Sequence, residues 1–199
     1  MKEIYAKDFL EAFASEWAVQ IEKDKAGVLE QYSRESTLTS FMLSSDGFLS
    51  KAMQRLKHLE PSLKYIGEFD KIDAVYVGGE DLFRSDLYYP SQLHVLIEHE
   101  NGEWVEEEMW KLVHWRSPLK VLIFYDWNED EKTTDKRRKW LEEKLEKLQE
   151  MSQKVDKFFT ENDETEYLYI IGNREESDGD VQWRCATKSA LKLTRFAGG

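Results

Sequence analysis

The sequence lacks the features that cross-link a protein or place it in a membrane. Its 199 residues include a single cysteine, Cys185, so an intramolecular disulfide and a cysteine-based zinc site are both excluded. Unbroken apolar runs extend over only a few residues, far short of the roughly 20 that cross a bilayer. The segment Met1–Tyr5 has no apolar centre of signal-peptide length. We therefore expect a soluble, cytoplasmic protein in a reducing compartment, without a membrane partner.

Positive charge is also scarce. Lys and Arg number 28 against 40 Asp and Glu, which gives a formal net charge of −12. Because Lys and Arg supply most of the affinity of proteins for phosphate backbones, this balance counts against a nucleic-acid function. A chain this acidic needs a local basic patch, a metal ion or a basic partner to bind phosphate.

Three common ligand-binding signatures are missing. The chain contains no Walker-type Gly-Lys-Ser/Thr loop and no G-x-G-x-x-G sequence for a dinucleotide. It also contains no Gly-x-Ser-x-Gly nucleophile elbow. The sequence therefore gives no indication of a P-loop, of a dinucleotide site or of an α/β-hydrolase site.

The distribution of apolar residues predicts the fold. A hydrophobic content of 41% and an aromatic content of 13% are typical of a folded chain. No repeat or linker divides the sequence, so residues 1–199 are predicted to form a single domain with N-terminal helices (1–60), a core (68–126) and a long helix with C-terminal strands (129–199). Apolar spacing predicts helices over residues 5–32, 47–58, 104–115 and 129–159, strands over residues 72–77, 93–100, 119–125, 167–171 and 181–186, and a short last element over residues 190–196. That order favours the α/β class, with a central mixed β-sheet flanked by helices.

Acidic residues at the ends of two predicted strands are the main candidates for a site. Glu98 and Glu100 lie two residues apart, so an extended strand places them on the same face. Asp73 begins the preceding strand and reaches the same point if the two strands pair. Carboxylates held together repel each other and need a cation or a basic side chain nearby. Oxygen ligands of this kind suit Mg²⁺.

The segments KIDAVYV, LHVLIEHEN, EEEMWKLVHW and PLKVLIFYDW together resemble the restriction-endonuclease-like, or PD-(D/E)xK, nuclease superfamily. Its core has an Asp at the head of one strand and an acid-x-Lys pair on the next, followed by a helix and another strand. Asp73 would be that Asp, and Glu98 and Glu100 would be the pair. The sequence departs from the pattern at Ile72, which replaces the Pro, and at Glu100, which replaces the Lys. Some members have an acid-x-acid pair and some carry the Lys on the next helix, where Lys111 is the candidate.

The resemblance implies a restriction-endonuclease-like core and metal-assisted hydrolysis of DNA phosphodiesters. Asp73, Glu98 and Glu100 would hold Mg²⁺ or Mn²⁺. Glu100 would alternatively act as a base, and Lys111 would position water or offset negative charge. The first helix of such proteins often adds an acid, for which Glu16 is the candidate, with Glu11 and Glu22 equally available.

Two other interpretations are compatible with the sequence. The first is a catalytically inactive protein on the same fold that binds a protein partner, favoured by the acidity and by aromatic residues such as Trp104 and Trp110. These aromatic residues would otherwise stack on bases or pack in the core. The second is a transition-metal site formed by His94, Glu98 and Glu100, in which alternation along the strand places His94 on the carboxylate face.

Overall fold

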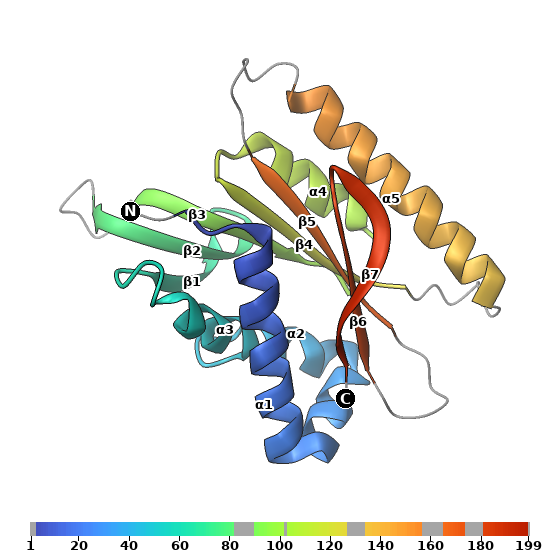
Figure 1. Ribbon diagram of the computed structural model, residues 1–199, viewed down its shortest axis with the longest axis horizontal. Coiled ribbons are helices and arrows are strands. Elements are labelled where there is room, and N and C mark those ends of the chain that lie inside the picture. Colours follow the sequence, from blue (N-terminus) through green and yellow to red (C-terminus); the bar gives the residue numbers. More distant parts are fainter. Residues whose placement is uncertain are drawn as a thin grey trace.

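The computed structural model describes residues 3–81, 90–101, 103–126, 134–156, 165–173 and 181–198 (Figure 1). Its helices are α1 (Ala6–Tyr32), α2 (Glu35–Leu43), α3 (Phe48–Leu56), α4 (Val105–His114) and α5 (Thr134–Asp156). Its strands are β1 (Lys64–Phe69), β2 (Ile72–Asp81), β3 (Pro90–His99), β4 (Leu119–Tyr125), β5 (Glu166–Gly172), β6 (Gln182–Thr187) and β7 (Ala190–Gly198). The outer parts of the helix predicted over residues 129–159 lie outside the described residues.

The strands form a seven-stranded mixed sheet in the order β1-β2-β3-β4-β5-β6-β7. The pairs β1–β2 and β2–β3 are antiparallel, and the central pairs β3–β4 and β4–β5 are parallel. The pairs β5–β6 and β6–β7 are antiparallel again. The helix α4 connects β3 to β4, as a parallel connection requires. The structure therefore confirms the α/β class and the mixed sheet flanked by helices.

Helices cover both faces of the sheet (Figure 1). The helices α1, α2 and α3 pack on one face, over a core rich in aromatic side chains such as Phe13, Trp17 and Trp183. The helices α4 and α5 pack on the other face, over aliphatic residues of β2, β3 and β4 and aromatic residues of β5. All seven residues of β4 are buried, which explains why its sequence is almost continuously apolar.

Two elements differ from the prediction. The strand β1 was not expected, because its sequence, KYIGEF, includes charged residues and a glycine. It forms an edge of the sheet, and its side chains are exposed or only partly buried. The helix α2 occupies a Ser/Thr-rich stretch between the helices predicted over residues 5–32 and 47–58. Leu38 and Met42, one helical turn apart, are fully buried. Tertiary packing of this apolar pair overrides the weak helix propensity of the residues around it.

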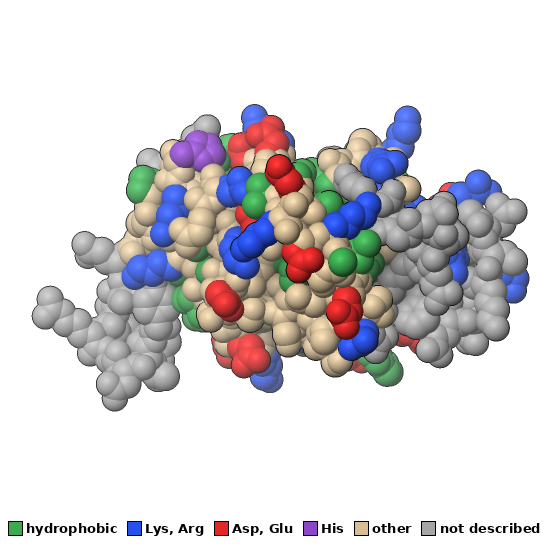
Figure 2. Space-filling view, turned by 90° about the horizontal axis from the view of Figure 1, so that it is seen from below, with side chains coloured by type: hydrophobic (Ala, Val, Ile, Leu, Met, Phe, Trp, Pro, Cys, Tyr) green, Lys and Arg blue, Asp and Glu red, His purple; other side chains and the backbone are tan. Residues whose placement is uncertain are grey.

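The apolarity of the helices and the distribution of surface charge bear on the predicted partners. Among the described residues, no helix combines the length and apolarity needed to cross a membrane. On the face seen from below Figure 1, acidic and basic side chains are interspersed, not separated by sign (Figure 2). The net charge of −12 is therefore not gathered into one acidic surface on that face.

Candidate metal centre

A tight hairpin brings Asp73 to the end of the sheet. The strands β1 and β2 are joined by Asp70 and Lys71, between the paired residues Phe69 and Ile72. The φ angles of Asp70 and Lys71 are 46° and 73°, as in a type I′ turn, whose twist matches that of paired strands. Asp73 is the second residue of β2, and alternation along this strand places its side chain on the face covered by α4 and α5.

Glu98 lies beside Asp73 because β2 and β3 run antiparallel, with Ala74 opposite Ile97. The backbone N–H of Asp73 donates to Oε2 of Glu98 across 3.4 Å. The backbone N–H of His99 donates to Oδ2 of Asp73 across 2.9 Å. These two backbone N–H groups, one at the start of β2 and one at the end of β3, thus hold the two carboxyl groups in fixed positions.

The helix α4 supplies two further charged groups. Val105, Met109 and Leu112 are buried against the sheet, and this turns Glu108 and Lys111 toward the end of β3. The Lys111 ammonium is ion-paired with Glu108 and lies 3.7 Å from Oε1 of Glu98. Acidic residues in the first turn of α4 and Lys111 in its last turn also suit the helix dipole.

Three carboxyl groups converge at this point. One oxygen from each of Asp73, Glu98 and Glu108 lies within 4.8 Å of the other two. Glu98 has no solvent-exposed surface, and its Oε1 atom accepts no hydrogen bond. A carboxylate buried in this way is costly, because the Asp73 N–H at Oε2 replaces only part of its lost hydration.

The electrostatics of the centre favour a bound cation. Burial first, and then the neighbouring Asp73 and Glu108 carboxyl groups, raise the pKa of Glu98 to about 10. Burial also raises the pKa of Asp73, against the opposing effect of the His99 N–H bond. Burial lowers the pKa of Lys111, but its contacts with Glu108 and Glu98 outweigh this and raise it. Without a cation, Glu98 holds a proton at neutral pH; a divalent cation can replace that proton.

The chemistry of the donors fits a hard divalent cation. The centre offers carboxylate oxygens and, among the described residues, no imidazole or thiolate belongs to the cluster. Mg²⁺ is usually held by one or two carboxylates together with water and phosphate oxygens. The buried Oε1 atom of Glu98, which lacks a hydrogen bond, is the clearest candidate ligand atom.

The structure brings together three of the four predicted site residues, Asp73, Glu98 and Lys111. Glu100 is not part of the cluster; Glu108 stands in its place. The strand β3 ends at His99, so Glu100 is the first residue after it. The backbone N–H of Glu100 donates to the carbonyl of Ile123 on β4. Only the three-residue spacing of Glu108 and Lys111 on a predicted helix signalled that Glu108 faces the centre.

Glu16, the candidate from the first helix, lies elsewhere. Its carboxylate accepts hydrogen bonds from Arg55 of α3, with the Nε and Nη2 atoms both 2.9 Å from Oε2. The amide of Gln20 donates to the other oxygen. Glu16 therefore joins α1 to α3 on the opposite face of the sheet from Glu98.

The predicted histidine site is also not assembled. Tyr76 pairs with Val95, but Val77 pairs with Leu93, so β3 contains one extra residue, His94, at a bulge. A bulge interrupts the alternation of side chains. The charges that act on His94 are those of Glu60 and Glu3, and His94 is absent from the cluster around Glu98.

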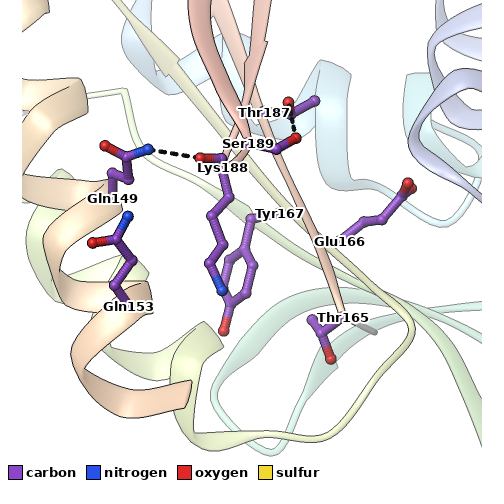
Figure 3. Close-up of a pocket in the computed structure, with 8 residues that line it drawn as sticks. All are labelled: Gln149, Gln153, Thr165, Glu166, Tyr167, Thr187, Lys188 and Ser189. Atoms are coloured by element: carbon purple, nitrogen blue, oxygen red, sulfur yellow. Dashed lines mark hydrogen bonds between the residues drawn. The ribbon is translucent and has the colours of Figure 1, made fainter. Parts of the chain in front are cut away.

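A hollow about 440 Å³ in volume lies between α5 and the turn from β6 to β7 (Figure 3). Its lining is Gln149, Gln153, Thr165, Glu166, Tyr167, Thr187, Lys188 and Ser189. The Gln149 amide donates to the carbonyl of Lys188 across 2.7 Å. The Glu166 carboxylate points away from α5 (Figure 3) and accepts the N–H of Ala6. These contacts join secondary-structure elements, and the lining has no counterpart of the carboxyl cluster.

Comparison of the chain with protein-family models, with curated protein sequences and with solved structures finds no match.

Proposed function

We propose that the protein is a Mg²⁺-dependent nuclease that hydrolyses DNA phosphodiester bonds at the centre formed by Asp73, Glu98 and Glu108. The observation that carries the proposal is the fully buried Glu98, whose Oε1 atom accepts no hydrogen bond while two more carboxyl groups lie beside it. Groups arranged at such a cost to folding are typical of functional sites.

The connectivity around the centre supports the nuclease resemblance. Asp73 stands near the head of β2, and Glu98 lies near the end of β3, its antiparallel neighbour. The helix α4 and the strand β4, which is parallel to β3, follow in order. The resemblance implies the same order of acids, helix and strand. Residues 68–126 therefore remain our candidate for a restriction-endonuclease-like core.

Each residue of the centre has a defined task in this proposal. Asp73, oriented by the His99 N–H, and Glu98, fixed by burial, would hold the cation, with Glu108 as a third ligand. A divalent cation held there supplies Lewis-acid polarisation of a phosphoryl oxygen and activation of water. The Lys111 ammonium would offset the negative charge that develops on the phosphate. Glu100, next to the centre in sequence, remains the candidate base.

Cleavage of a supercoiled plasmid and of a single-stranded oligonucleotide, with Mg²⁺ or Mn²⁺, tests the proposal. We expect cleavage to require the cation and to fall at least about 100-fold in Glu98→Gln. Glu103→Gln, which changes an exposed acid near the start of α4, is the matched control and should keep wild-type activity. Absence of cleavage with either cation, or full activity of Glu98→Gln, would refute the nuclease proposal.

A second candidate function is a catalytically inactive protein on the same fold that acts by binding a partner. It is favoured by Lys111, whose ammonium is already ion-paired with Glu108, and by Glu100, which stands where the resemblance places a Lys. This alternative predicts that DNA is not cleaved, whether or not Mg²⁺ binds.

A further inference from the structure

Two tryptophans on α4 are exposed to solvent to an unusual degree. Trp104, the N-cap residue, has 66% of its surface exposed, and Trp110 has 60%. The other large hydrophobic residues that are well exposed in the described part of the chain are Tyr5 and Val19, each with 42% of its surface exposed. Large aromatic side chains concentrate in protein cores and at binding interfaces, so two on one short helix indicate a contact surface.

An acidic residue lies between the two rings. Trp104 lies three residues before Glu107 and Trp110 three residues after it, so each tryptophan adjoins Glu107 on the surface of α4. Glu107 is exposed and forms no ion pair with any other described residue. His114 packs on the far side of Trp110, with ring centroids 4.3 Å apart, and holds that indole in place. We call Trp104, Glu107 and Trp110 the tryptophan strip.

The chemistry of the tryptophan strip selects its partner. A guanidinium group is planar, stacks on an indole face and pairs with a carboxylate through two parallel hydrogen bonds. A carboxylate between two indoles offers both interactions at once. We propose that the tryptophan strip is a docking surface for an arginine-bearing segment of a partner protein.

Charge favours this partner over nucleic acid. Glu106, Glu107 and Glu108 form the first turn of α4, where Glu106 is ion-paired with Lys144 and Glu107 has no such partner among the described residues. The whole chain carries a net charge of −12. The nearest cation on the helix, Lys111, is ion-paired with Glu108. A phosphate backbone laid along the strip would meet carboxylates, whereas an arginine-bearing segment meets complementary charge.

Calorimetry with two short peptides, Arg-Gly-Arg-Gly-Arg and Lys-Gly-Lys-Gly-Lys, tests the proposal on the full chain at physiological salt. The peptides carry the same charge, so general attraction to an acidic protein affects them equally. We expect the arginine peptide to bind at least about 5-fold more tightly than the lysine peptide. The double variant Trp104→Ala/Trp110→Ala should remove this preference, and Glu107→Gln should weaken it.

The substituted side chains are exposed, so the variants should fold normally. Val19→Ala, at another exposed apolar position on α1, should leave the preference for arginine unchanged. Equal affinity for the two peptides, or a preference that survives loss of both tryptophans, would overturn the proposal. So would an oligothymidylate that binds through the tryptophans while the arginine peptide does not. The result does not depend on whether the protein cleaves DNA.

Discussion

Two buried glutamates on opposite faces of the sheet show how differently one fold can treat the same side chain. Glu16, a residue of α1, is 5% exposed and accepts hydrogen bonds from the Arg55 guanidinium and the Gln20 amide. Glu98, under α4, is completely buried. Its nearest basic group, the Lys111 ammonium, lies 3.7 Å away and is also ion-paired with Glu108.

The difference lies in the groups that surround each carboxylate. The hydrogen bonds to Glu16 replace the water that the carboxylate loses on burial, so its charge is compensated within the fold. Glu98 is surrounded by two more acids, and its Oε1 atom accepts no hydrogen bond. The fold therefore compensates the charge of Glu16 with two donor side chains, whereas Glu98 has one backbone N–H and an ammonium group that it shares with Glu108.

The largest effect should come from removing the partner of Glu16. Arg55→Met keeps most of the side-chain volume but leaves a buried carboxylate unpaired, and we expect a loss of about 3 kcal/mol in the free energy of unfolding. Urea denaturation measures it. Adding Glu16→Gln to this variant should recover part of the loss, because the buried charge is removed. If Arg55→Met unfolds like the wild type, Glu16 is not held as described.

A second effect should appear on addition of Mg²⁺. A cation that binds only the folded chain raises the free energy of unfolding by about 2.7 kcal/mol at 100 times its dissociation constant. Urea denaturation with and without Mg²⁺ measures it. Glu108→Gln should reduce this gain more than Glu100→Gln, since only Glu108 belongs to the cluster. The opposite order would return Glu100 to the centre.

The pH dependence of stability should report the raised pKa of Glu98. The pKa of Glu98 is raised to about 10, and that of Asp73 is raised too. The folded chain therefore keeps protons that the unfolded chain has lost above its ordinary carboxyl pKa. Without divalent cations, this contribution is complete below about pH 4.5 and is lost as the pH rises toward about 10.

The expected slope is at most about 1.4 kcal/mol per pH unit for each extra proton held. Glu108 and Lys111 of α4, together with Asp73 of β2, face Glu98 and act on its pKa. Urea denaturation at several pH values in the presence of a chelator measures the slope, and Glu98→Gln should flatten it. Stability that instead rises between about pH 5 and about pH 9 would contradict the raised pKa of Glu98.

The smallest effect should come from the turn that places Asp73. Lys71 has a φ of 73°, a conformation that glycine adopts without strain. Lys71→Gly should raise the free energy of unfolding by about 0.5 kcal/mol, after the greater freedom of glycine in the unfolded chain is counted. Mg²⁺ binding should not change. A loss of stability would mean that the turn differs from type I′.

Much of the fold could be predicted because the elements carry strong local patterns. The continuous apolar run of β4 and the apolar spacing of α1 and α4 fixed three elements nearly to the residue. The elements that were missed, β1 and α2, are stabilised by contacts with distant residues. Tyr65 of β1, for example, donates its hydroxyl to the carbonyl of Leu43. No local pattern encodes such a contact.

The site was predictable where antiparallel pairing decides it and not where strands end or bulge. Asp73 and Glu98 meet because a hairpin and its neighbouring strand bring them together. The cluster does not include Glu100, which lies one residue past the end of β3, or His94, which is the extra residue of a bulge. Strict alternation describes neither feature. Glu108 enters through the rotation of α4, which depends on packing against the sheet.

Calorimetric titration of Mg²⁺ at neutral pH, repeated in two buffers of different ionisation enthalpy, tests the central claim most directly. We expect one Mg²⁺ per chain and release of a proton on binding, because the cation would replace the proton on Glu98. Both signals should be lost in Glu98→Gln and kept in Glu103→Gln. Undetectable binding to the wild type, or equal binding and proton release by Glu98→Gln, would contradict a cation centre at Glu98.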